Sequence, residues 1–238
     1  AGVLIEPEPR NTAPAILAAV LAALARDPEA MLLIAPSDHV IADPAAFRQA
    51  VALGLPAAEG GAIVTFGIRP DRAETGYGWL ELGGLSDPAA AGSGAGALPL
   101  AGFVEKPDAP RAAELLASGR HLWNAGIFLG RADRLHAAFL AHAPGLVPAV
   151  TAAMAGARPD LDFLRLDPAP WAGLPDISID YAVMEQASGL MVVPYDGAWS
   201  DLGDWAAVRR ESPIDAAGNS QSGPVIALEC QDSLLRSE

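Results

Sequence analysis

The sequence predicts an α/β fold with a mixed, mainly parallel sheet and helices on both faces. Short apolar runs alternate with longer Ala- and Leu-rich segments in the order strand, helix, strand, helix, strand, which is the pattern of a parallel sheet covered by helices. The runs are continuously apolar, as strands buried on both faces are. With 51% hydrophobic and 18% charged residues among 238, the chain can form a sizeable core.

The first elements follow from local signals. The apolar run at residues 3–5 predicts a strand. Thr12 is the expected N-cap of a helix over residues 12–25, with Pro14 tolerated in its first turn. Further runs predict strands at 31–35 and 62–68 and a helix at 44–58.

The later part of the chain is less regular. Residues 83–99 are rich in Gly, Ala and Ser and are expected to be a flexible surface connection without chemistry of its own. Residues 144–175 are punctuated by prolines and are expected to be helical in part. The remaining patterns predict strands at 77–82, 100–105, 121–129 and 191–195, and helices at 108–118, 131–141, 178–187 and from near Asp204.

A change of composition near Pro213 predicts the domain organisation. Asp, Gly, Asn and Ser accumulate there, so we expect one domain over residues 1–212, followed at 213–238 by a linker and the start of a β-rich segment. That segment includes a strand-like run at 225–228. The chain opens almost at once on its first strand and closes soon after this last run, so both ends are expected to be cuts through a longer protein.

Charge and cysteine content limit the classes of partner. A net charge of −14 argues against a nucleic-acid backbone or an anionic membrane, because both favour basic patches. A phosphorylated ligand would need a local cation or a metal. Cys230 is the only cysteine, so an internal disulfide is impossible and a reducing compartment, the cytoplasm, is expected. No signal peptide or apolar run of membrane-spanning length is present.

Polar residues occur where several predicted strands end. In a doubly wound sheet, ligands bind outside the carboxyl ends of the strands. The residues at such ends are Glu6, Asp38, Glu105 with Lys106, Asn124 and Asp201.

Asp38 and Asp201 have two interpretations. Two carboxylates from distant strand ends can hold one Mg²⁺, which prefers oxygen ligands and usually keeps waters and substrate phosphates in its shell. Alternatively each stabilises a turn, with Asp204 the better cap of the helix that follows Asp201. His39, beside Asp38, is expected to have a structural or orienting role.

Glu105 and Lys106 close a strand side by side. Neighbouring side chains on a strand point to opposite faces, so the two are expected to serve different parts of one ligand and not simply to pair. A lysine suits a phosphate, and a glutamate can accept hydrogen bonds from two sugar hydroxyls. The alternative is a solvated strand end.

Three further residues each keep two interpretations. Asn124 interrupts an apolar strand and must find partners, either a ligand hydroxyl or a neighbouring backbone group. Asp180 can bind a ligand, although an acid in the first turn of a helix suits the helix dipole without any function. Gly78, in a Gly-Tyr-Gly turn, lets a sugar approach the backbone closely or merely begins a strand.

Taken together, these segments resemble the sugar-1-phosphate nucleotidyltransferases, and within them the mannose-1-phosphate guanylyltransferase branch. The resemblance covers roughly residues 3–210, and the block at 10–15 favours the guanylyl, mannose branch. Seven ordered motifs carry it: residues 6–15 (Glu-Pro-Glu-Pro-Arg-Asn-Thr-Ala-Pro-Ala), 36–39 (Pro-Ser-Asp-His), 76–78 (Gly-Tyr-Gly), 103–107 (Phe-Val-Glu-Lys-Pro), 123–128 (Trp-Asn-Ala-Gly-Ile-Phe), 178–185 (Ser-Ile-Asp-Tyr-Ala-Val-Met-Glu) and 199–203 (Trp-Ser-Asp-Leu-Gly).

The resemblance implies a Rossmann-like nucleotide-diphospho-sugar transferase fold and a reaction between GTP and mannose 1-phosphate. Asp38 and Asp201 would hold Mg²⁺, and Lys106 would neutralise the sugar phosphate and the attacked α-phosphate. Neither a nucleic acid nor a membrane is an expected partner, and a homo-oligomer is left open. The same resemblance would place mannose hydroxyls on Glu105, Asn124 and Asp180 near the Gly78 backbone, and guanine near Asn11 and Thr12.

One element of the family pattern has no counterpart in the chain. The family's N-terminal phosphate loop is a Gly-rich turn with an arginine after the first strand, and it cradles the triphosphate. The chain is therefore expected to be a fragment with little or no turnover alone. Two alternatives stay open: a transferase for another pair, such as UTP with glucose 1-phosphate, and a non-catalytic homologue that binds a sugar nucleotide.

Overall fold

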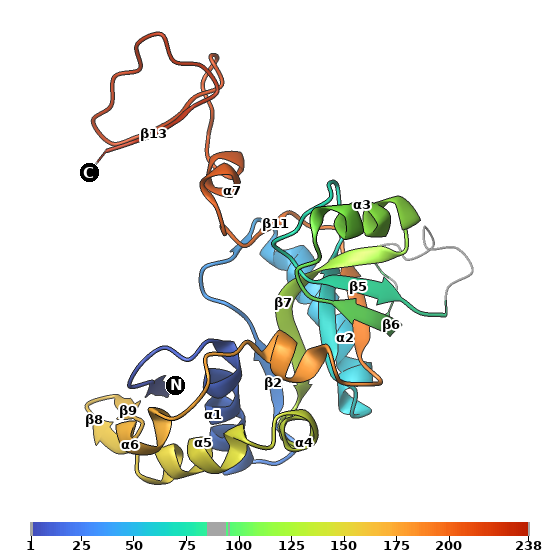
Figure 1. Ribbon diagram of the computed structural model, residues 1–238, viewed down its shortest axis with the longest axis vertical. Helices are drawn as coiled ribbons and strands as arrows, with labels where there is room; N and C mark the ends of the chain where they lie inside the picture. The colour runs from blue at the N-terminus through green and yellow to red at the C-terminus, as the bar shows by residue number, and fades with distance from the viewer. Residues whose placement is uncertain (1, 85–93, 95, 238) are drawn as a thin grey trace. The chain divides into compact units, whose positions relative to one another are not determined.

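The chain divides into two compact units. A computed structural model describes residues 2–84, 94 and 96–237. The first unit comprises residues 1–35 and 45–196, and the second comprises 36–44 and 197–238 (Figure 1). The second unit thus joins a short early segment to the C-terminal part of the chain. The domain boundary expected at residue 212 stays a prediction.

A six-stranded sheet forms the framework of the first unit. Its strands follow the order β2-β7-β4-β10-β6-β5, and β7 pairs in addition with β5. All six were predicted, with bounds that match closely. They are β2 (Met31–Ile34), β4 (Val64–Ile68), β5 (Trp79–Leu82), β6 (Leu98–Val104), β7 (His121–Arg131) and β10 (Met191–Tyr195).

The sheet is mixed, as expected, but its neighbouring strands are mostly antiparallel. Strands β2, β4, β5 and β10 run in one direction, and β6 and β7 run in the other. The reversed strands lie between the others, so β4 with β10 is the parallel pair of this sheet within the described part of the chain. Most strands therefore run in the same direction, as a mainly parallel sheet requires. Most neighbouring strands are nevertheless antiparallel, because the two reversed strands separate the others.

Strand β1 (Val3–Ile5) lies outside this sheet, although the sequence pattern placed it there. It pairs in parallel with β9 (Phe163–Arg165), which pairs antiparallel with β8 (Arg158–Asp160). The Pro-punctuated segment at 144–175, expected to be partly helical, therefore also contains two strands. Unlike β1, neither of these three-residue strands is a continuous apolar run, because their sequences are Arg-Pro-Asp and Phe-Leu-Arg, so the sequence pattern did not reveal them.

Helices cover both faces of the six-stranded sheet (Figure 1). On one face Phe47 of α2 contacts the rings of Phe66 and Tyr195. On the other face Phe128 joins a core built with α1, α4 and α5. The helices of this unit are α1 (Thr12–Leu24), α2 (Pro44–Glu59), α3 (Ala109–Ser118), α4 (Ala132–His142), α5 (Leu146–Ala155) and α6 (Pro168–Trp171), with a π-helical turn, η2 (Asp180–Met184).

The N-cap of α1 is Asn11, not Thr12 as expected. The Asn11 side chain accepts a hydrogen bond of 2.9 Å from the Thr12 N–H, and its backbone has a φ of 62°. Thr12 is the first helical residue, and its Oγ1 accepts a hydrogen bond of 2.9 Å from the N–H of Ile179. The start of α1 is thereby tied to the residue that precedes η2, in place of the longer helix expected at 178–187.

The second unit consists of short elements. The helix expected near Asp204 is present, and Asp204 is its N-cap. Its elements are β3 (Val40–Ile41) antiparallel to β11 (Trp199–Ser200), α7 (Trp205–Arg210), and β12 (Ser220–Ser222) parallel to β13 (Leu234–Arg236).

The strand-like run at 225–228 does not form a strand. These residues adopt bends and irregular structure, and the strands form on either side of them instead. Ile226 and Leu228 are 85% and 77% exposed. A strand is stabilised by the packing of its side chains, and Ile226 and Leu228 have little packing here.

Two sequence expectations concern segments beyond these elements. The connection at 83–99 lies largely outside the described residues. None of the helices in the described residues combines the length and the apolar character needed to cross a membrane.

Candidate functional site

Most of the predicted substrate-binding residues meet where β5, β6 and β7 converge in the first unit. Trp79 of β5 stands opposite both the last residue of β6 and Trp123 of β7, so Gly78, Glu105 and Asn124 are neighbours. The Asn124 N–H donates to the Gly78 carbonyl at 2.8 Å. A Cβ added to Gly78 would lie 2.5 Å from Oε2 of Glu105, so a glycine is required for the approach of this carboxylate.

Asn124 lies at a bulge of β7, and three hydrogen bonds hold its amide. The pairing with β4 shifts register between Thr65 and Gly67, and Gly126 has a φ of 66°. The Asn124 Oδ1 accepts from Thr65 Oγ1 at 2.9 Å and from the Gly126 N–H at 3.2 Å. Its Nδ2 donates to Asp180 Oδ1 at 2.8 Å. The sequence left two kinds of partner open for Asn124, a ligand hydroxyl or a backbone group. The structure supplies a backbone partner, the Gly126 N–H, and adds the side chains of Thr65 and Asp180.

Glu105 and Asp180 place two carboxyl groups in one partly buried region. Burial first, and then the charge of Asp180, raise the pKa of Glu105 from 4.5 to about 7, although Lys106 opposes the shift. Burial also raises the pKa of Asp180, against the hydrogen bond from Asn124. Carboxylates accept hydrogen bonds and an amide N–H donates them, so this set of groups suits a ligand with several hydroxyls.

Glu105 and Lys106 contact each other, contrary to the expectation that they would point to different faces. The Lys106 Nζ lies 3.6 Å from Glu105 Oε1. Strand β6 ends at Val104 and Lys106 has a φ of 47°, so the alternation of side chains along a strand no longer applies. The Lys106 side chain is 56% exposed, which keeps its ammonium group accessible to an anion.

Asp38 and Asp201 lie at the same end of a two-stranded ladder in the second unit. Asp38 precedes β3 by two residues, Asp201 follows β11 directly, and these strands are antiparallel. His39 is close enough to both aspartates to be affected by their charges. Burial lowers the pKa of His39, and both aspartates partly offset that effect. Trp199 Nε1 donates to His39 Nδ1 at 3.3 Å, in line with an orienting role for this histidine.

The aspartate pair fits a magnesium ion in its donor chemistry. Mg²⁺ is usually held by one or two carboxylates, with waters and substrate phosphates completing the shell. Over residues 2–84, 94 and 96–237, no group of three or more His, Cys, Asp or Glu side chains could hold a metal. An ion at this place would therefore have Asp38 and Asp201 as its carboxylate ligands, with waters or substrate phosphates completing the shell. The turn role considered for Asp201 is also present, because its Oδ1 accepts from the Gly203 N–H.

Asn11 and Thr12, expected near guanine, both have roles in the fold. Asn11 caps α1, and Thr12 accepts a hydrogen bond from Ile179. Both residues are exposed. Their contact with guanine stays a prediction.

Sequence reasoning overlooked Thr65. This residue is 2% exposed and contacts the amide of Asn124. The signal was available, because Thr65 is a lone polar residue in the apolar run at 62–68. The same signal singled out Asn124.

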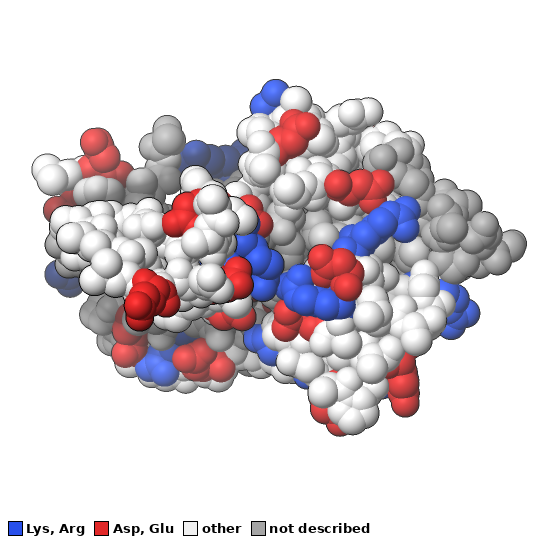
Figure 2. Space-filling model, turned by 90° about the horizontal axis from the view of Figure 1, so that it is seen from above, with Lys and Arg blue, Asp and Glu red and all other residues white. Residues whose placement is uncertain are grey.

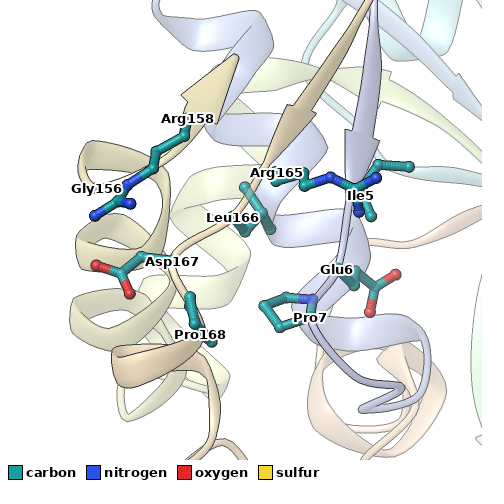
Figure 3. Close-up of a pocket in the computed structure, with 9 residues that line it drawn as sticks. All are labelled: Ile5, Glu6, Pro7, Gly156, Arg158, Arg165, Leu166, Asp167 and Pro168. Carbon is teal, nitrogen blue, oxygen red and sulfur yellow. The ribbon is translucent and has the colours of Figure 1, made fainter. Parts of the chain in front are cut away.

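A separate cavity of about 420 Å³ opens beside β1 and β9 (Figure 3). Glu6 and Asp167 lie on opposite sides of it, and their carboxylates point away from each other in this view. Arg165 is paired with Asp160 at 2.6 Å, and Asp167 caps α6. Several of its charged groups thus already have roles in the fold, and the residues of the two clusters described above do not line it.

Basic and acidic side chains are interspersed on the face shown in Figure 2. Several arginines are paired with carboxylates. Examples are Arg120 with Glu81 at 2.6 Å and Arg111 with Glu114 at 2.8 Å. Such pairing leaves little uncompensated positive charge around the arginines involved.

Comparison with known proteins places the chain in a family. Residues 2–217 match the Nucleotidyl transferase family. The chain belongs to this family. The family and the nucleotide-diphospho-sugar transferase fold expected from the sequence are thereby confirmed.

Three relatives illustrate how closely this nucleotidyl transferase resembles known proteins. Xanthan biosynthesis protein XanB of Xanthomonas campestris pv. campestris (strain B100) is 45% identical over 97% of the chain and 48% of XanB. Mannose-1-phosphate guanylyltransferase of Escherichia coli (strain K12) is 42% identical over 99% of the chain and 49% of that enzyme. The crystal structure of mannose-1-phosphate geranyltransferase from Thermus thermophilus has a TM-score of 0.77 and 35% identity, covering 98% of this chain and 67% of that one. The chain spans about half the length of the curated relatives it matches.

Proposed function

We propose that the protein containing this chain transfers GMP from GTP to α-D-mannose 1-phosphate, giving GDP-mannose and pyrophosphate. The observation that carries the proposal is the cluster of Gly78, Glu105, Asn124 and Asp180 with the ammonium group of Lys106 beside it. Carboxyl and amide groups suit sugar hydroxyls, and an ammonium group suits a phosphate. Relatives named mannose-1-phosphate guanylyltransferase, 42% and 41% identical to the chain, support the choice of substrates.

The proposed reaction is an in-line displacement at the α-phosphorus of GTP. An oxygen of the mannose 1-phosphate attacks that phosphorus, the bond to the oxygen that bridges the α- and β-phosphates breaks, and pyrophosphate leaves. A protein nucleophile is unnecessary. The main obstacle is the approach of two polyanions, so the protein contributes positioning and neutralisation of charge.

Each group of the first-unit cluster has a part in this proposal. Lys106 neutralises the sugar phosphate and the attacked α-phosphate. Glu105, Asn124 and Asp180 hold mannose hydroxyls, and the Gly78 backbone lies beside Glu105 because a side chain there would collide with it.

Asp38 and Asp201 are the proposed ligands of Mg²⁺. A bound Mg²⁺ would neutralise negative charge on the reacting phosphates and polarise the α-phosphoryl group. The two aspartates present oxygen donors at one end of the β3–β11 ladder. Burial lowers the pKa of His39, which favours its neutral form, and the charges of Asp38 and Asp201 oppose that effect. Asn11 and Thr12 are proposed to lie near guanine. A cytoplasmic location is also part of the proposal, because a single cysteine suits a reducing compartment.

The test is an assay of pyrophosphate release with the protein made from the full open reading frame. GTP and UTP are each combined with mannose 1-phosphate and with glucose 1-phosphate. We expect GTP with mannose 1-phosphate to have the highest kcat/KM, by about tenfold or more. A higher value for UTP with glucose 1-phosphate would remove the mannose assignment. Binding of mannose 1-phosphate without pyrophosphate release from any pair would favour the non-catalytic homologue.

A further inference from the structure

We propose that Thr65 is a positioning residue for the sugar, because it fixes the amide of Asn124 as a hydrogen-bond donor. The inference rests on the proposed function, in which Asn124 holds a sugar hydroxyl. Thr65 itself is not proposed to touch the substrate. Its role is to act through Asn124, from strand β4, which pairs with β7.

The hydroxyl of Thr65 is enclosed beside the Asn124 amide. Thr65 is 2% exposed and Asn124 is 7% exposed. Thr65 Oγ1 lies 2.9 Å from Asn124 Oδ1 and 3.1 Å from the carbonyl oxygen of Ile127. Both neighbours accept hydrogen bonds, so the single hydroxyl hydrogen is shared between Asn124 and the bulge of β7.

The partners of the amide decide its orientation. An asparagine side chain has an oxygen end and a nitrogen end of similar size, and only hydrogen bonds distinguish them. The Gly126 N–H is a donor and requires the oxygen end. The Asp180 carboxylate is an acceptor and requires the nitrogen end. In the opposite orientation two donors would meet at Gly126 and two acceptors at Asp180.

Thr65 completes this arrangement at the oxygen end. Together with Gly126 it occupies both acceptor positions of Asn124 Oδ1. The Nδ2 group has two hydrogens, and one of them is donated to Asp180. A ligand can therefore use Asn124 only as a donor, through the second Nδ2 hydrogen.

A fixed donor complements the rest of the site. Ionised Glu105 and Asp180 only accept hydrogen bonds, whereas a sugar hydroxyl both donates and accepts. Beside these two carboxylates, Asn124 supplies a donor to a hydroxyl oxygen. Removal of the Thr65 hydroxyl leaves the oxygen end of the amide with the longer contact of 3.2 Å to Gly126, so the amide becomes less well ordered.

The experiment compares two variants of Thr65 in the protein from the full open reading frame. Thr65→Val keeps the shape and removes the hydroxyl, and Thr65→Ser keeps the hydroxyl. We expect Thr65→Val to raise KM for mannose 1-phosphate by about tenfold, with kcat and KM for GTP within about threefold. Thr65→Ser should stay within about threefold of the wild type in all three constants.

Val64→Ala is the matched control for lost packing. Val64 precedes Thr65 in β4, and its side chain points toward α2. A Cβ added to Gly54 of α2 would lie 3.3 Å from Val64 Cγ1. This variant is expected to lower the melting temperature without raising KM for mannose 1-phosphate. An equal rise of KM in Val64→Ala and Thr65→Val would mean that general loosening of β4 is the cause, and the positioning role would be rejected.

A second readout needs no substrate. Hydrogen exchange of the Asn124 side-chain amide, followed by NMR, should be slow in the wild type and in Thr65→Ser and about tenfold faster in Thr65→Val. Unchanged exchange in Thr65→Val overturns the inference. Faster exchange in a protein that does not bind mannose 1-phosphate would refute the proposed function and leave the control of the Asn124 amide by Thr65 standing.

Discussion

Glu105 and Asp180 carry a free-energy cost that a ligand can relieve. Two carboxyl groups share a partly buried region, and both have raised pKa values because burial disfavours their charged forms. Perturbed groups of this kind concentrate at functional sites, although structural networks produce them as well. A ligand that donates hydroxyl hydrogens to these oxygens would lower the cost, which is consistent with the proposed sugar site.

Glu105→Gln is expected to change how stability depends on pH. The pKa of Glu105 is raised from 4.5 to about 7, so between these values the folded protein keeps a proton that the unfolded chain releases. The wild type therefore loses stability as the pH rises through this window. The part of this loss that comes from Glu105 is on the order of 1–3 kcal/mol, and Glu105→Gln should lack that part because glutamine cannot titrate. Urea unfolding at about pH 5 and about pH 8 measures it.

Glu114→Gln is the control for this prediction, because Glu114 is an exposed partner of Arg111. It should follow the wild type at both pH values. The prediction fails when wild type and Glu105→Gln lose equal stability between the two conditions.

Gly78→Ala is expected to weaken sugar-phosphate binding. Its new Cβ would lie 2.5 Å from Glu105 Oε2 and 3.2 Å from the ring of Phe103, so the carboxylate must move. We expect the dissociation constant of mannose 1-phosphate to rise about tenfold or more, measured by calorimetry. In the same turn, Gly76→Ala serves as the control, since the nearest neighbour of its Cβ would be Glu74 Oε1 at 3.4 Å. Equal affinities for the two variants would contradict the role of Gly78.

At the scale of elements, the bulge of β7 creates the site. In regular antiparallel pairing, each residue of β7 would face one residue of β4. Here the register shifts between Thr65 and Gly67. Strand β7 therefore has more residues than β4 over this stretch. This bulge allows Asn124 Oδ1 to accept a hydrogen bond from the Gly126 N–H while Asn124 Nδ2 donates to Asp180 of η2. Bulges often re-aim side chains in this way next to functional sites.

Gly126→Ala is expected to destabilise the fold through this bulge. Gly126 has a φ of 66°, a conformation that costs other residues about 1–2 kcal/mol. The free energy of unfolding should fall by about that amount in chemical denaturation. Gly130→Ala, on the same strand, has its nearest neighbour at 3.5 Å, an ordinary van der Waals contact, and should cost less than Gly126→Ala. Equal costs would mean that strain at the bulge is not the cause.

At the scale of the whole molecule, the proposed roles fall into separate units. The sugar-binding cluster belongs to the first unit, and the aspartate pair belongs to the second. Affinity for the sugar phosphate and catalytic turnover should therefore respond to different substitutions.

Asp201→Asn is expected to reduce Mg²⁺-dependent turnover by about 100-fold or more, because a neutral amide is a poorer ligand for Mg²⁺. The affinity for mannose 1-phosphate, measured without GTP, should stay within about threefold. Asp204→Asn is the matched control. Asp204 caps α7, and asparagine caps a helix about as well as aspartate. Comparable loss of turnover in both variants would contradict the metal role of Asp201.

Several features of this protein could be determined from the sequence alone. Apolar runs located the strands of the main sheet, because a buried strand needs a continuous apolar stretch. Lone polar residues at strand ends and within strands indicated Glu105, Asn124 and Asp201, because a polar group there needs a partner. Ordered motifs indicated the family.

Other features were decided only by the tertiary structure. Strand partners are set by contacts between distant segments, so the sequence did not show that β1 pairs with β9 or that β7 lies reversed between β2 and β4. A positive φ at Lys106 turned its side chain onto Glu105. The contact of Thr65 with Asn124 joins residues 59 positions apart, and local patterns carry no information about such a pairing.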